Sequence, residues 1–331
     1  PESEGLVRIR WQVATDDAFT SIVVDGEGTT TAEVDYTAKV DVQGLEPGTR
    51  YWYRFLVGET VSPVGRTRTL PAGAVAAVSL AVVSCSNYPA GFFNVYREIA
   101  ARDVDAVVHL GDYLYEYDRD GYASDRAEEF DRVSMPETEL FTLSDYRTRY
   151  AQYRSDPDLQ NCHGAHPFLA VWDDHEVAND AWRGGAENHD PDTEGDFEER
   201  RAAALQAYYE WLPVRPPADD LLVVYRQFRF GDLVDLLMLD TRLIGRDQQL
   251  AYADFSNGGT IDVDAVRAAA EDSSRQLLGE EQSAWLKDRL TSSTATWQVL
   301  GQQVLVGRYT LPSPIIEALD PSNLDEEALQ E

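Results

Sequence analysis

Side chains that commonly bind metal ions follow three short apolar runs of the chain. Ser84-Cys85 follows residues 78–83, Gly111-Asp112 follows residues 104–110, and Asp173-Asp174-His175 follows residues 168–172. Such runs are typical of buried strands, and the helical spacing of apolar residues in 92–102 indicates a parallel strand pair joined by a helix. Open α/β sheets bind ligands at the carboxyl ends of their strands, so we expect these side chains at one sheet edge. Carboxylate oxygens there suit hard cations.

Further segments extend this pattern in a fixed order along the chain. They are Gly111-Asp112-Tyr113-Leu114-Tyr115-Glu116, Trp172-Asp173-Asp174-His175-Glu176-Val177, Leu239-Asp240-Thr241-Arg242, Leu278-Gly279-Glu280-Glu281-Gln282 with Trp285-Leu286, and Trp297-Gln298-Val299-Leu300-Gly301-Gln302-Gln303. Together with Ser84-Cys85 they resemble the motifs of the PhoD-type alkaline phosphatases, within the calcineurin-like metallophosphoesterases. The resemblance covers nearly the whole chain. It implies an α/β/β/α sandwich preceded by a small all-β fibronectin III-like sandwich.

The resemblance also implies a metal centre with one Fe³⁺ and one or two Ca²⁺ ions. It makes Cys85 a thiolate ligand and Tyr115 a phenolate ligand of the iron, although Tyr115 can alternatively be an aromatic side chain that packs under a loop. Asp112 is expected to bridge two ions, since it directly follows a strand-ending glycine. Asp174, Asn179 or both are expected to bind calcium, and the choice between them stays open.

Two basic side chains of these motifs are candidates for contact with a phosphoester. His175 is expected to orient the phosphate or to donate a proton to the leaving oxygen, because its ordinary pKa is near neutrality. Arg242 can place its guanidinium on phosphate oxygens or form a salt bridge, and the two roles are equally weighted. We interpret His109 as a core histidine. His163, His166 and His189 have no assigned role, and a metal cluster built from Cys162, His163 and His166 is disfavoured.

The composition excludes several classes of protein. The chain has 331 residues, 59 acidic and 28 basic, and a net charge of −31, which disfavours a steady nucleic-acid partner. An acidic surface repels anionic phosphoesters, so the site itself must supply local positive charge, and metal ions are the obvious source. No stretch reaches the roughly 20 apolar residues of a transmembrane helix. Two cysteines make no disulfide framework. The first residues carry no leader, so we expect a secreted, periplasmic or cell-surface protein whose signal is removed or lies outside this sequence.

The domain organisation is predicted as residues 1–70 and 74–331, with a linker at 71–74. Alternating residues indicate strands at 7–13, 36–42 and 51–55, and Tyr51 resembles the tyrosine corner of fibronectin III sandwiches, here incomplete at one edge. In the second part we expect loops at 117–143 and 182–197, and helices at 198–212 and 276–290. A β-hairpin is expected from 223–230 and 233–239, and a buried strand at 297–306.

The resemblance fails at the end of the chain, where the family has a Gly-Asp-x-His segment that supplies final metal ligands. Residues 308–331 contain none, and 320–331 form an acidic tail. We therefore expect the active molecule to contain the remainder of the same precursor, as a second chain or a continuation.

Three functions follow from these residues. The leading one is a secreted metal-dependent hydrolase of phosphate monoesters and diesters. The alternatives are a phospholipase D-like phosphodiesterase and a fibronectin-like surface-binding protein with a decayed enzyme domain. Decay predicts loss of Asp112 or His175, and both are present.

Overall fold

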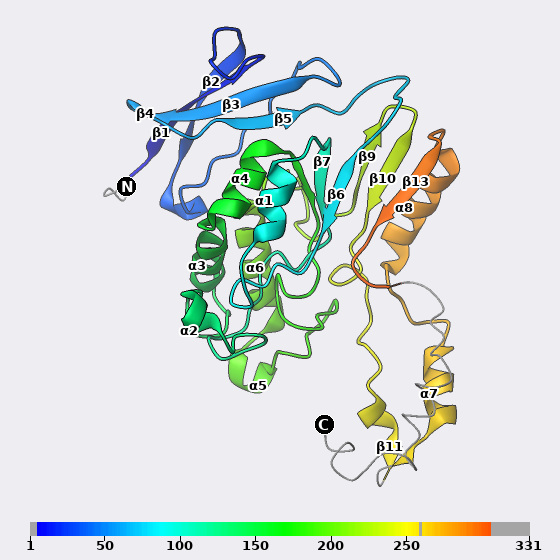
Figure 1. Ribbon diagram of the computed structural model, residues 1–331. Coiled ribbons are helices and arrows are strands. Elements are labelled where there is room, and N and C mark those ends of the chain that lie inside the picture. Colours follow the sequence, from blue (N-terminus) through cyan, green and yellow to red (C-terminus); the bar gives the residue numbers. More distant parts are fainter. Residues whose placement is uncertain (1–4, 258–259, 306–331) are drawn as a thin grey trace.

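The computed structural model describes residues 5–257 and 260–305 (Figure 1). The N-terminal part is one antiparallel sheet in the order β2-β1-β3-β4, with β5 also paired to β3. Its strands are β1 Val7–Ala14, β2 Ile22–Thr30, β3 Arg50–Val57, β4 Thr60–Val61 and β5 Gly65–Arg68. The strands predicted at 7–13 and 51–55 are confirmed. The described residues form a single sheet here, and the fibronectin III-like sandwich expected for residues 1–70 stays a prediction.

Residues 36–42 form no strand, which corrects the prediction made from their alternation. The 3-10 helix η1 Ala32–Val34 precedes them. Lys39 donates to the backbone oxygens of Tyr209 and Glu210, so this segment contacts the end of a helix instead of pairing in a sheet. Strand β2 was missed because its glycines weaken the strand signal. Gly26 lies opposite Trp11, and a Cβ at that position would collide with the indole ring.

The tyrosine corner is confirmed. Tyr51 is only 3% exposed, and its hydroxyl accepts a hydrogen bond from the backbone N–H of Glu46 at 3.0 Å. This bond fixes the turn that leads into β3, because a buried hydroxyl requires a polar partner.

The strands predicted to carry the ligands form a parallel sheet in the order β6-β7-β8. They are β6 Leu80–Val83, β7 Ala106–His109 and β8 Phe168–Ala170. Val83, His109 and Ala170 are in register at its carboxyl end, so the predicted shared edge is confirmed. The connecting helix α1 Asn94–Ala100 differs from its predicted face. Phe92 and Val95 are exposed, whereas Tyr96 is the buried residue of the helix.

Further helices form much of the part of the molecule drawn in green (Figure 1). They are α2 Ala127–Phe130, α3 Leu143–Arg154, α4 Pro157–Ala165, α5 Pro191–Glu194 and α6 Phe197–Trp211. The N-terminus of α3 has a capping box between Thr142 and Asp145, and Asp196 caps α6. Helix α6 confirms the helix predicted at 198–212. The short helices α2 and α5 lie in segments predicted to be loops, where one turn falls below the length that periodicity detects.

A second sheet, in the order β13-β10-β9, completes the described architecture. Its strands are β9 Arg226–Phe230, β10 Val234–Met238 and β13 Trp297–Gly301. Strands β9 and β10 confirm the predicted hairpin, and helix α8 Gly279–Ser292 confirms the helix expected near 276–290. Smaller elements precede α8, namely η2 Tyr252–Phe255, β11 Ser256–Asn257, β12 Thr260–Ile261 and α7 Val263–Ala270.

Both sheets of the α/β part contribute to one hydrophobic core. Val107 and Ala170 of the first sheet and Leu236 and Met238 of the second belong to it. Strand β13 was predicted to be buried, and that prediction is wrong. Trp297 is 64% exposed and Leu300 45%. Among the described residues, β13 is also an edge strand that pairs only with β10. Val306 and the acidic tail lie outside the described residues. No described helix has the length and apolar character needed to cross a bilayer.

Candidate metal centre

The candidate site forms where the parallel strands end and the chain turns sharply. Past β6 and β7 the two segments stay joined, because Cys85 N–H donates to Gly111 O at 3.2 Å and Ser86 N–H to Asp112 O at 2.7 Å. Cys85 and Asp112 adopt positive φ angles of 60° and 54°. Non-glycine residues in this left-handed region are uncommon and concentrate at functional sites. Gly111 has φ 105°, and a Cβ there would clash with the backbone nitrogen of Asp173.

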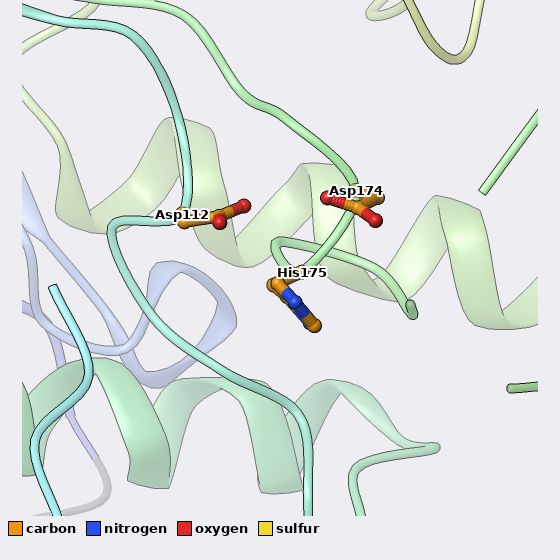
Figure 2. A group of neighbouring side chains, drawn as sticks. All are labelled: Asp112, Asp174 and His175. Atoms are coloured by element: carbon orange, nitrogen blue, oxygen red, sulfur yellow. The ribbon is translucent and has the colours of Figure 1, made fainter. Parts of the chain in front are cut away.

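Asp112, Asp174 and His175 form the centre of the site. Ligand atoms of these three buried residues all lie within 4.8 Å of one another. Figure 2 shows the carboxylates of Asp112 and Asp174 facing each other from two separate loops, with His175 beside them. The Oδ1 atom of Asp112 is buried and accepts no hydrogen bond from the described residues. A buried carboxylate oxygen without a donor fits a cation, so these residues suit a metal ion.

Burial and the repulsion between neighbouring carboxylates raise the pKa values of the acidic side chains in and around this cluster. Burial raises the pKa of Asp112 to about 6; the positive charge of His175 acts against this rise, and the negative charge of Asp174 adds to it. Asp173 behaves similarly, since burial and then Asp174 raise its pKa to about 7. Two or more carboxylates held this close are stabilised by a shared cation.

Glu176 joins the two loops that carry the carboxylates. Its buried side chain accepts backbone N–H groups from Asp112 at 3.0 Å, Tyr113 at 2.6 Å and Asp173 at 2.8 Å. Burial, followed by the charge of Asp112, raises the pKa of Glu176 to about 8. Glu176 therefore positions the backbone on both sides of the cluster. Sequence reasoning placed it in a motif and gave it no role.

Glu116 orients His175. Its Oε2 atom lies 2.7 Å from His175 Nδ1, and its Oε1 accepts the N–H of Asn179 at 2.7 Å and the amide of Asn188 at 3.0 Å. Burial would lower the pKa of His175, but the hydrogen bond and charge of Glu116, with the charges of Asp174 and Asp112, raise it to about 9. His175 thus donates through Nδ1. Glu116 was missed as a site residue, and its only signal was its place at the end of the Gly-Asp motif.

Tyr115 and Cys85 lie beside the three central residues. The Tyr115 hydroxyl donates to Asp112 Oδ2 at 3.1 Å, and its ring centroid is 4.1 Å from that of His175. Tyr115 therefore both packs against the cluster and points its oxygen into it. Cys85 is exposed and is not one of the three residues within 4.8 Å. Desolvation raises the pKa of its thiol, and the charge of Asp112 raises it further.

Arg242 is engaged by carboxylates. Its Nε lies 2.6 Å from Asp173 Oδ1, one terminal nitrogen 3.0 Å from Asp180 Oδ1, and the other 3.5 Å from Asp174 Oδ1. Asp240 shapes the loop by accepting the N–H groups of the next residues, including that of Arg242 at 2.7 Å. Of the two roles predicted for Arg242, the structure shows the salt bridges.

Asn179 remains a candidate ligand. Its side-chain nitrogen donates to Glu187 Oε2 at 3.0 Å, while Asp174 Oδ2 accepts the N–H of Asp180 at 2.6 Å. Asp174 belongs to the central cluster and Asn179 lies on the loop that follows it.

The remaining histidines behave mainly as structural residues. His109 is fully buried, with Tyr96 OH 3.0 Å from Nε2 and Gly111 N–H donating to Nδ1, and burial lowers its pKa to about 3. It is a core histidine, as predicted. His163 stacks on Phe168 with centroids 3.6 Å apart. Within the described residues, Cys162 and its neighbouring histidines form no candidate metal group.

Residues 80–327 match the model of the PhoD-like phosphatases, and residues 1–71 match that of their N-terminal domain. The chain belongs to the PhoD-like phosphatase family.

Two relatives of this family can be compared along most of the chain. It is 40% identical over 321 residues to alkaline phosphatase D of Bacillus subtilis (strain 168), covering 93% of the chain and 52% of that protein. A solved structure described as the structure of PhoD matches with a TM-score of 0.80 and 39% identity, covering 92% of this chain and 56% of that one. The chain thus spans about half the length of these relatives.

Proposed function

We propose that this PhoD-like chain is a metal-dependent hydrolase of phosphate monoesters and diesters. The observation that carries the proposal is the buried group of Asp112, Asp174 and His175, in which one carboxylate oxygen has no hydrogen-bond partner among the described residues. The similarity to alkaline phosphatase D supports the same reaction class.

Asp112 is the proposed bridging ligand, with Cys85 and Tyr115 on a ferric ion and Asp174 or Asn179 on calcium. The side chains of Asp112 and Tyr115 already touch, and the Cys85 backbone is tied to the same loop. Bound ions at such a site neutralise phosphate oxygens and activate water.

The chain's own residues supply the remaining requirements. His175, with Nδ1 held by Glu116, has Nε2 available to hydrogen bond a phosphoryl or leaving oxygen, since Nε2 has no partner among the described residues. Arg242 holds Asp173, Asp174 and Asp180 together and so keeps the acidic loop in place.

Asp112→Asn tests the proposal. We expect the variant to fold, to bind less metal, and to lose at least about 100-fold in turnover of p-nitrophenyl phosphate and bis-p-nitrophenyl phosphate, because a neutral amide binds two cations weakly. Asp120→Asn, on the exposed loop that follows, is the matched control and should leave turnover unchanged. Thermal unfolding and metal analysis accompany both variants. Near-normal turnover in Asp112→Asn, or wild-type turnover that survives chelation of all metal, would refute the proposal.

A further inference from the structure

We propose that Arg246 is the substrate-binding arginine of this site, and that its guanidinium contacts the non-bridging oxygens of an anionic phosphoester. The inference rests on the proposed function and extends it to the residue that recognises the substrate's charge. The sequence motifs assigned a possible phosphate contact to Arg242 and no role to Arg246.

Arg246 lies on a loop that is anchored at several points. The loop follows β10, and the carboxylate of Asp240 accepts the N–H groups of residues 242, 243 and 244. Gly245 packs directly on the backbone of Gly279, where a Cβ would collide. Asp247 accepts the N–H of Gln276 at 2.8 Å. The backbone on both sides of Arg246 is therefore held against helix α8 and the segment before it.

The same loop is joined to the acidic loop of the metal centre. Arg246 O accepts the N–H of Arg183 at 3.1 Å, and Asp247 pairs with the Arg183 guanidinium at 2.7 Å. Gln249 donates to the backbone oxygen of Asp180 at 3.0 Å. The backbone of Arg246 is therefore bonded to residues 180–183, which directly follow the candidate ligands.

The two arginines of this loop differ in what neutralises them. Arg242 is paired with Asp173, Asp174 and Asp180, so a phosphate would have to displace carboxylates to reach it. Arg246 is half-buried, yet its side chain makes no hydrogen bond or ion pair with any described residue, and its Nε is fully buried without a partner.

An arginine held in this way needs an anion that the described residues do not supply. A buried donor left without a partner costs free energy, and a cation costs more. Burial lowers the pKa of Arg246 and the charge of Arg242 lowers it further, against the opposing charges of Asp180, Asp173 and Asp174. Arginine presents a planar fork of N–H donors that matches phosphate oxygens.

The experiment compares metal-loaded wild type with Arg246→Ala, Arg246→Lys and Arg215→Ala. Arg215 is the control, because it is an exposed arginine that is already paired, with Asp41, and takes no part in anchoring this loop. Binding of inorganic phosphate is measured by calorimetry. Hydrolysis is measured with dianionic p-nitrophenyl phosphate and with monoanionic bis-p-nitrophenyl phosphate. Thermal unfolding checks that each variant is folded.

We expect Arg246→Ala to weaken phosphate binding by about 10- to 100-fold, the range for a lost charge-assisted contact. Its KM should rise more for the dianionic substrate than for the monoanionic one, with a smaller change in kcat. Arg246→Lys should recover part of the affinity, and Arg215→Ala should resemble wild type.

Equal phosphate binding by wild type and Arg246→Ala would overturn the inference, as would an equal loss in Arg215→Ala or no phosphate binding by either protein. If wild type binds phosphate but hydrolyses neither ester, the proposed function fails and the phosphate comparison still decides the role of Arg246.

Discussion

Glu116→Gln is the most direct test of how the site holds His175. Glu116 is fully buried, and it accepts hydrogen bonds on both oxygens, from His175 on one side and from Asn179 and Asn188 on the other. Glutamine has nearly the same shape but only one accepting oxygen. The variant therefore changes the hydrogen bonding of this position with little change in packing.

Either orientation of the new amide breaks a contact. If its oxygen faces His175, its NH₂ group opposes the donors of Asn179 and Asn188. If its NH₂ faces His175, Nδ1 must accept, so the ring has to lose its Nδ1 proton and is left protonated on Nε2 alone. A lost hydrogen bond to a charged group is worth about 1.5–3 kcal/mol, so we expect the free energy of unfolding to fall by about that amount. A wrongly protonated imidazole costs about 10²- to 10⁴-fold in proton-transfer catalysis, so kcat should fall at least 100-fold.

The assay combines turnover of bis-p-nitrophenyl phosphate, urea unfolding and nitrogen NMR of the His175 ring. Glu187→Gln is the control, since Glu187 accepts from the side chain of the same Asn179 but is exposed and does not touch His175. It should stay within about twofold of wild type in kcat, as surface substitutions usually have small effects. Wild-type kcat in Glu116→Gln, with the Nδ1 proton retained on His175, would refute the reasoning.

Two further predictions concern iron and pH. Cys85→Ala should lose bound iron and the visible charge-transfer band expected from Tyr115. Cys162→Ala, which changes a buried cysteine outside the site, should keep both. Metal analysis and absorption spectra measure the two effects, and a colourless, iron-free wild type would contradict this prediction. His109 has a folded-state pKa of about 3 against about 6.5 unfolded, so the unfolded chain binds the proton first and stability falls as pH drops below about 6.5. The free energy of unfolding should be about 2 kcal/mol lower at pH 5 than it would be without this proton uptake. Urea unfolding at several values from pH 5 to 8 should show that the free energy of unfolding depends less steeply on pH in His109→Gln than in wild type. An equal dependence on pH in the two proteins would exclude this cause.

Local sequence pattern was enough to predict the ligand-bearing edge of the sheet. Three apolar runs, each followed by polar residues, became parallel neighbours, and Asp112, Asp174 and His175 came together as expected. The pattern is informative because buried strands have short apolar runs and parallel strands end on the same side.

The features that were missed depend on contacts between residues far apart in the chain. Glu116 meets His175 across 59 residues, and no local signal specifies that pair. The burial of a strand depends on what covers it, so the apolar residues of β13 predicted a core strand that the described structure leaves exposed. Residues 36–42 alternate like a strand, but Lys39 is bound at the end of α6.

The left-handed backbone at the metal centre lowers the stability of the fold at residues that the proposed chemistry needs. Cys85, Asp112 and Asp180 all have positive φ, a conformation that costs non-glycine residues about 1–2 kcal/mol and glycine almost nothing. At position 112 a glycine would also remove a buried carboxylate whose oxygen lacks a partner among the described residues. Selection for heat resistance alone would thus favour glycine at the positions that make the site useful. Engineering of this chain toward greater stability therefore has to select for metal retention at the same time, because a more stable variant can be one that has lost its metal centre.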